Sequence, residues 1–166
     1  MKTISAYTIT VNAKTQDLPF KEAIRGCSQF ADEVVAMDFG STDGTYEDLE
    51  ALKLELPNLK IYRDEWDYTK PDMMGIAKTK ARRKCTKEWC YQFDNDEIPH
   101  EKDNDKWRKL IDEFPQVTIF SPAIITFYGG VNTGNFRPSC YKWTLLPNHP
   151  WIIHGWYHVF LKSCQR

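Results

Sequence analysis

The sequence lacks the signals of an exported or membrane-spanning chain. It has no run of 18 apolar residues and no basic start followed by an apolar stretch. Its five cysteines include no Cys-x-x-Cys pair, which argues against a disulfide framework or a zinc knuckle and favours a reducing cytoplasm. A net charge of -1 gives no electrostatic footprint for nucleic acid. We therefore expect a cytoplasmic globular protein that binds no nucleic acid.

The sequence also lacks the glycine motifs of common nucleotide-binding loops. The segment "GSTDGT" at 40–45 has neither the Gly-Lys of a P-loop nor the GxGxxG of a dinucleotide-binding fold. After "DNDE" at 94–97, Ile98 and Pro99 stand where an EF-hand loop needs an oxygen ligand and then glycine. A P-loop, a dinucleotide fold and a calcium loop are thus excluded as explanations of these segments.

Apolar patterning predicts strands that alternate with helices in the first 100 residues. Strands are expected at 4–11, 33–39, 59–62 and 88–93, and helices at 18–30, 46–56 and 73–85. This order predicts one α/β domain with a mainly parallel sheet covered by helices on both faces. Beyond Pro99 we expect one helix at 105–114 and then a β-rich extension, with strands within 116–130, 140–146 and 151–161.

Acidic residues follow two of the expected strands. Asp38 closes the second strand, and Asp94 and Asp96 follow the fourth. Residues two apart in an extended chain point the same way, so Asp94 and Asp96 should project together while Asn95 faces away. Paired carboxylates suit Mg²⁺ or Mn²⁺, which such pairs hold together with substrate phosphates. Because parallel sheets bind ligands beyond the carboxyl ends of their strands, the pattern predicts a phosphorylated ligand there.

A simpler interpretation of both acidic segments stays open. The acids after the fourth strand fit a solvated turn, and Asp43 or Thr42 fits a cap of the helix that follows "GSTDGT".

Taken in order, four segments resemble the family 2 glycosyltransferases of GT-A fold, especially the branch that adds sugars to the lipopolysaccharide core. They are "ITVNA" at 9–13, "EAIRGCSQFADEVVAMDFGSTDGT" at 22–45, "IYRDEWDY" at 61–68 and "GIAKTKARRKCTKEWCYQFDNDE" at 75–97. The aspartate-ended strand with its Ser-Thr-Asp-Gly-Thr turn and the Trp-led strand with its Asp-x-Asp-Glu motif are the strongest parts. The resemblance implies one GT-A domain over 1–166, with a nucleotide-sugar half at 1–100 and an acceptor half at 101–166 that is minimal or truncated.

The resemblance also implies an inverting transfer from a UDP-sugar to a saccharide or lipid-linked saccharide, at the inner face of a membrane where the acceptor is a lipid. Asp96 would bind Mn²⁺ or Mg²⁺, Asp94 the metal or the ribose, Asp38 the uracil or ribose, and Lys78 the diphosphate. The implied nucleotide-sugar site consists of Val11, Asn12, Asp38, Lys78, Asp94 and Asn95.

The catalytic base is where the resemblance weakens. His158 falls where that branch has the histidine of a His-Glu pair, but Val159 replaces the glutamate. His158 would be a metal ligand or lie beside the acceptor, or else it packs among its aromatic neighbours, and His154 has the same alternatives. Glu97 is a second candidate for the base. The aromatic residues between Tyr141 and Phe160 fit an acceptor sugar site or a small core.

Two other functions stay open. A nucleotidyltransferase also places paired acids and a metal at a sheet edge, but it needs a glycine-rich loop after the first strand, where this chain has "VNAKTQDLP". A non-catalytic nucleotide- or carbohydrate-binding domain is favoured by the Val159 departure.

Overall fold

Four parallel strands and one antiparallel strand form the central sheet of the protein. The computed structural model describes residues 2–122, 124–127, 134–137, 144–149, 152–154 and 159–161, with the backbone alone described at 134–137, 152–154 and 159–161. The sheet order is β3 (Leu59–Arg63), β2 (Glu33–Asp38), β1 (Ile4–Thr10), β4 (Trp89–Gln92) and β7 (Leu145–Pro147). Strands β1 to β4 are parallel, and β7 runs antiparallel to β4. The predicted α/β class is thereby confirmed.

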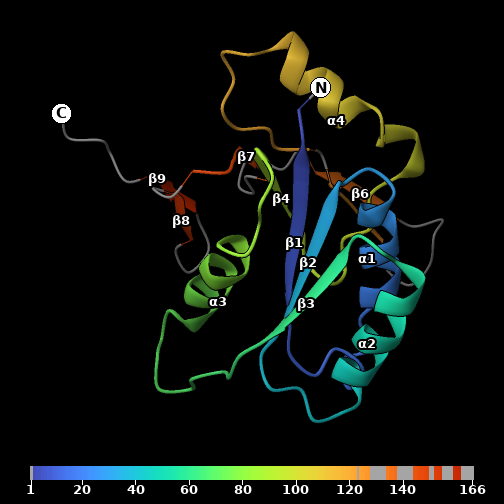
Figure 1. Cartoon of the computed structure of the whole chain (residues 1–166), viewed down its shortest axis with the longest axis vertical. Coiled ribbons are helices and arrows are strands. Elements are labelled where there is room, and N and C mark those ends of the chain that lie inside the picture. Colours follow the sequence, from blue (N-terminus) through green and yellow to red (C-terminus); the bar gives the residue numbers. More distant parts are fainter. Residues whose placement is uncertain are drawn as a thin grey trace.

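Helices cover both faces of this sheet. Helices α1 (Phe20–Ser28) and α2 (Thr45–Glu55) lie on one side, and α3 (Met73–Arg82) lies on the other (Figure 1). The core is accordingly split into two layers: Phe20 and Leu49 belong to the α1 and α2 layer, and Met37 and Ala77 to the α3 layer. Strands buried on both faces explain the continuous apolar run of β2.

The region beyond Pro99 is rich in short strands, as predicted. A 3₁₀ turn (Glu101–Asp103) and α4 (Lys106–Glu113) precede two hairpins, β5 (Ile124–Phe127) with β6 (Gly134–Arg137) and β8 (Ile152–His154) with β9 (Val159–Leu161). The strand expected within 116–130 begins only at Ile124, because Pro122 lacks the N–H that a ladder requires. In the segment that precedes Pro122, Phe120 forms an isolated bridge to Leu145.

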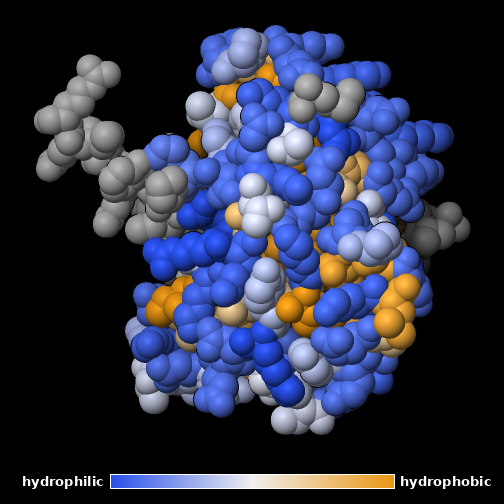
Figure 2. All heavy atoms as spheres, viewed as in Figure 1, coloured by the Kyte–Doolittle hydropathy of each residue, from blue (hydrophilic) through white to orange (hydrophobic). Residues whose placement is uncertain are grey.

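The face of the protein that Figure 2 shows is mainly polar. Figure 2 shows apolar side chains in small separate groups among hydrophilic ones. In the described part of the chain, no helix has the length and apolar character needed to cross a membrane.

Strand β2 begins with a buried carboxylate that joins four segments. Glu33 accepts hydrogen bonds from Ser5 Oγ in β1 at 2.5 Å and from Lys60 Nζ in β3 at 2.6 Å. The backbone N–H of Thr86, between α3 and β4, donates to it at 2.8 Å. Burial alone would raise the pKa of Glu33, but these donors outweigh it and lower the pKa. This network fixes the alignment of three strands at the edge where they begin.

Replacing Glu33 should destabilise the whole sheet. We expect Glu33→Gln to lower the free energy of unfolding by about 2 kcal/mol, because the amide cannot accept every bond and leaves buried donors unsatisfied. Urea unfolding measures the change. Glu88→Gln, which breaks an exposed ion pair with Lys2, is the matched control and should cost much less. Equal losses in the two variants would contradict the central role of Glu33.

Candidate functional site

The polar residues singled out in the sequence collect at one edge of the sheet. Because β1 to β4 are parallel, their carboxyl ends lie together, and we call this the carboxyl edge. Asn12 follows β1, Asp38 ends β2, Asp64 follows β3 and Asp94 follows β4. Helix N-termini and loop amides converge on such an edge, which makes it the place for an anionic ligand.

Asp38 is buried at this edge and only half satisfied. Its Oδ2 accepts from the N–H groups of Gly40 at 3.2 Å and Ser41 at 3.1 Å, and lies 3.4 Å from Nε of Arg63. Its Oδ1 is buried and has no hydrogen-bond partner among the described residues. An unpaired buried carboxylate oxygen costs free energy, so a ligand N–H or O–H would be a favourable donor.

The loop after β2 is bonded to the chain that leaves β1. The N–H of Asn12 donates to Ser41 Oγ at 2.8 Å, and the N–H of Thr42 donates to Asn12 Oδ1 at 2.8 Å. Asn12 has a φ of +47°, which asparagine tolerates better than most residues. Val11, also predicted for the site, is partly buried beside it and accepts a bond through its carbonyl oxygen from Gln16.

Asp43 lies next to Gly44, the N-cap residue of α2, and its side chain bonds the first residue of that helix without capping it. Its Oδ1 accepts from the hydroxyl and N–H of Thr45 at 2.6 and 3.0 Å, and its Oδ2 from the N–H of Thr15 at 2.8 Å. Partial desolvation opposes ionisation, but these bonds prevail and lower the pKa of Asp43 to about 2. Asp43 therefore shapes the loop that holds Asp38.

The chain turns directly after β4, whereas the sequence predicted extended geometry there. The N–H of Glu97 donates to the carbonyl oxygen of Asp94 at 3.0 Å, and the N–H of Asp94 donates to Glu97 Oε2 at 2.9 Å. A turn replaces the alternation of a strand, so alternation does not set the direction of Asp94 and Asp96. Glu97, the candidate base, is engaged in closing this turn.

Asn95 is buried and points toward β1. Its Nδ2 donates to the carbonyl oxygen of Ile9 at 3.0 Å, and its Oδ1 accepts from Thr8 Oγ1 at 3.2 Å. Asn95 thus anchors the acidic turn to the neighbouring strand.

The two predicted metal ligands differ in their surroundings. Asp94 Oδ1 lies 2.9 Å from Nζ of Lys78 and accepts from Gln92 Nε2 at 2.8 Å, whereas Asp96 is exposed. Among the described residues, no three His, Cys, Asp or Glu side chains gather as a metal site. The pair nonetheless suits a hard divalent cation that takes one or two carboxylates and completes its shell with water and phosphate.

Two predicted residues lie beyond this description. His158 falls outside the described residues, and His154 lies in β8, where only the backbone is described.

The sequence analysis overlooked the exit of β3. Arg63 approaches Asp38, and its guanidinium lies over the ring of Tyr46 at 4.4 Å. Asp64 pairs with Lys80 at 2.5 Å, and that hydrogen bond lowers the pKa of Asp64. The rule that ligands bind at strand exits, applied to the third strand as well as to the second and fourth, would have identified both residues.

Comparison with known proteins gives structural but not sequence matches. No family profile and no curated protein sequence matches this chain. TarS 1-349 of S. aureus is 23% identical with a TM-score of 0.60, and the match covers 84% of this chain and 40% of that one. It is also known with UDP and with UDP-GlcNAc. The mannosyltransferase PcManGT of Pyrobaculum calidifontis, in complex with GDP-Man and Mn²⁺, is 22% identical with a TM-score of 0.58, over 72% of this chain and 35% of that one.

These likenesses establish the fold class. The chain has the GT-A fold of glycosyltransferases, as the sequence predicted. It spans about two fifths of the length of the TarS chain that it matches.

The bonds of Asp43 give a prediction for pH dependence. We expect Asp43→Asn to lower the unfolding free energy at pH 7 by about 1 kcal/mol, the usual net contribution of a hydrogen bond. The folded-state pKa of about 2 lies below the unfolded value near 3.9, so this contribution is lost as the pH falls through that window. Urea unfolding at pH 7 and below pH 4 should show the two proteins converging. The exposed Glu47→Gln serves as control, and a pH-independent difference for Asp43→Asn would contradict the assignment.

Proposed function

We propose that this chain is a glycosyltransferase domain that moves a sugar from a UDP-sugar to a saccharide or lipid-linked saccharide acceptor with the help of Mn²⁺ or Mg²⁺. The observation that carries the proposal is the buried Asp38 Oδ1 without a donor, at the same edge of a GT-A sheet as the acidic turn of β4. The solved complexes of TarS with UDP-GlcNAc and of PcManGT with GDP-Man and Mn²⁺ support this choice of ligand.

The nucleoside would lie along the exits of β1 and β2. Asp38 Oδ1 accepts an N–H or O–H from uracil or ribose, which satisfies the buried oxygen. Asn12 and Val11 line this place, and their bonds to the neighbouring loops keep it rigid.

The diphosphate would lie over the turn of β4. Asp94 and Asp96 supply the oxygen ligands, and the divalent cation held there stabilises negative charge on the departing UDP. The ammonium of Lys78 lies 2.9 Å from Asp94, so it could rotate toward a phosphate that is bound over this turn. Exchange of one ionic partner for another keeps the desolvation cost of Lys78 small.

Transfer would proceed by one in-line displacement with inversion. The acceptor oxygen bonds to the anomeric carbon, the bond from that carbon to the phosphate oxygen of UDP breaks, and the acceptor proton passes to a base. Glu97 and His158 are the candidates for the base, and Glu97 would have to release the N–H of Asp94 to act.

The proposal includes a role for each half of the chain and a class of acceptor. Residues 1–100 form the nucleotide-sugar half and 101–166 the acceptor half of one domain. The acceptor belongs to lipopolysaccharide or polysaccharide synthesis, and the domain works as a family 2 enzyme at the cytoplasmic face of the membrane that carries it.

A second candidate is a binding domain derived from such an enzyme, which Val159 favours because it stands where the resembling branch has glutamate. An assay of UDP-sugar hydrolysis separates the two, because an active transferase transfers some sugar to water. A domain that binds UDP with Mn²⁺ but never releases sugar supports the second candidate.

Substitution of Asp96 tests the proposed metal site. We expect Asp96→Asn to weaken Mn²⁺-dependent UDP binding at least about tenfold, since one of two ligand carboxylates is lost. Fold stability should hold, because Asp96 is exposed. Calorimetric titration with UDP in Mn²⁺ and then in EDTA gives the measurement, with the exposed Asp112→Asn as control. Full metal-assisted binding by Asp96→Asn would remove Asp96 from the ligand set.

Substitution of Asp38 tests the proposed nucleoside site. We expect Asp38→Ala to weaken UDP binding about tenfold or more, the usual value of a hydrogen bond to a charged group, by the same factor in Mn²⁺ and Mg²⁺. The titration is paired with thermal unfolding, so that loss of fold is recognised. Unchanged UDP affinity in a folded variant would show that Asp38 only ends its strand.

A further inference from the structure

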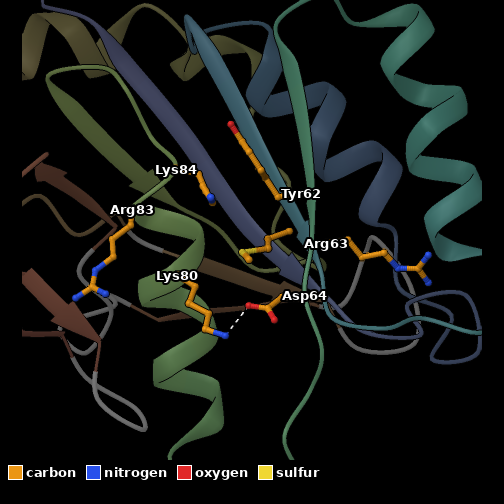
Figure 3. Close-up of a pocket in the computed structure, with 7 residues that line it drawn as sticks. Tyr62, Arg63, Asp64, Lys80, Arg83 and Lys84 are labelled. Carbon is orange, nitrogen blue, oxygen red and sulfur yellow. Dashed lines mark hydrogen bonds and ion pairs between the residues drawn. The ribbon is translucent and has the colours of Figure 1, made fainter.

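A cavity lies between α3 and the edge strand β3. Its volume is about 490 Å³, and Figure 3 shows the residues that line it. From the sheet it is lined by Met37 of β2, by Tyr62 and Arg63 of β3 and by Asp64, which follows β3. From α3 and the residues that follow, it is lined by Lys80, Arg83 and Lys84. We call this cavity the α3–β3 groove.

The fold explains why the groove exists. β3 is the outer strand of the sheet, so no further strand continues the surface next to Tyr62. Lys80, Arg83 and Lys84 are spaced at i, i+3 and i+4, which places them on one side of a helical turn. Sequence and topology together therefore gather three cations beside a partly apolar surface.

Carboxylates neutralise only part of this charge. Lys80 pairs with Asp64 at 2.5 Å, and Arg63 at the groove's end lies 3.4 Å from Asp38. Lys84 lies over the ring of Tyr62 at 5.0 Å. Within the described part of the chain, neither Arg83 nor Lys84 forms an ion pair with a carboxylate, although the charge of Lys84 helps the Lys80 hydrogen bond to lower the pKa of Asp64. The groove thus keeps two cations for an external anion.

The ordinary explanation accounts for the charge but not for the cavity. Basic side chains at a helix C-terminus are favourable by about 0.3–1 kcal/mol through the helix dipole, and exposed lysines are commonly just solvated. Neither effect requires cations to face an apolar surface across a cavity. Volumes of roughly 300–1,000 Å³ are typical of small-molecule sites and exceed what a lone phosphate needs.

We propose that the α3–β3 groove binds a phosphate ester of a sugar or polyol. The phosphate is held by Arg83 and Lys84, since a guanidinium fork and an ammonium are the usual phosphate ligands in proteins. The carbon skeleton lies against Tyr62 and Met37. The proposal is independent of catalysis at the carboxyl edge.

The groove is distinct from the proposed diphosphate site. Lys78 lies at the carboxyl edge, where it pairs with Asp94. Lys84 is six residues further on, about 9 Å along a helix axis. A ligand in the groove would therefore leave the acidic turn free for another ligand.

Amide NMR titration tests the groove with glucose 6-phosphate and with a phosphodiester-linked glycerol oligomer. We expect shifts at Tyr62 and at 80–84 that persist when UDP and Mn²⁺ are present, and none with unphosphorylated glucose. The double variant Arg83→Gln/Lys84→Gln should weaken binding at least about tenfold, as loss of charged hydrogen bonds predicts. Lys53→Gln/Lys109→Gln removes the same charge from exposed positions on α2 and α4 and should retain binding.

Each outcome decides the proposal. Tighter binding of the oligomer identifies a phosphodiester polymer as the source of the phosphate, and equal binding identifies a small phosphosugar. Shifts confined to 38–45 that UDP abolishes would overturn the proposal by placing the phosphate at the carboxyl edge. Equal loss in both double variants would reduce the effect to general charge attraction, and no shift with either ligand would refute the groove as a site. UDP affinity unchanged in Arg83→Gln/Lys84→Gln keeps this test separate from the proposed transfer.

Discussion

Strand β2 buries a carboxylate at each of its two ends, and the two are satisfied to different degrees. Glu33, at the start, receives hydrogen bonds from β1, β3 and the chain before β4. Asp38, at the end, has one oxygen bonded to its own loop and one without a donor in the described structure. Because burying an unpaired carboxylate oxygen is unfavourable, the well-satisfied edge stabilises the sheet while the other is suited to a ligand.

Side chains, more than regular structure, hold the carboxyl edge together. Asn12 joins the exit of β1 to the loop after β2, Asp43 joins that loop to Thr15, and Asn95 joins the turn after β4 to β1. Each connection crosses between loops that backbone ladders do not reach. Polar groups for a ligand are thus positioned before it arrives, which reduces the entropy lost on binding.

Periodicity in the sequence was sufficient to predict the parallel strands β1 to β4. The strand ends were sufficient to predict that Asp38 and the acids after β4 lie at the carboxyl edge. Alternation failed after β4 because the Glu97 side chain closes a turn there, and a contact of that kind leaves no periodic trace. Arg63 was missed for another reason: strand ends were considered only for the second and fourth strands, although Arg63 ends the third, beside Asp38. Apolar content predicted strand structure within 116–130, but β5 starts only at Ile124, after Pro122.

The basic residues of α3 differ in their partners along the helix, and this follows from how the helix crosses the sheet. Lys78 meets Asp94 beyond β4, and Lys80 meets Asp64 beyond β3, because carboxylates occur where the strands end. Strand interiors are buried and apolar, so Lys84, further from that edge, lies over the ring of Tyr62 instead. The same arrangement that collects acids at the carboxyl edge leaves cations without acids further along. The two anion sites that we propose therefore differ in construction: one would depend on a metal between carboxylates, and the other on cations alone.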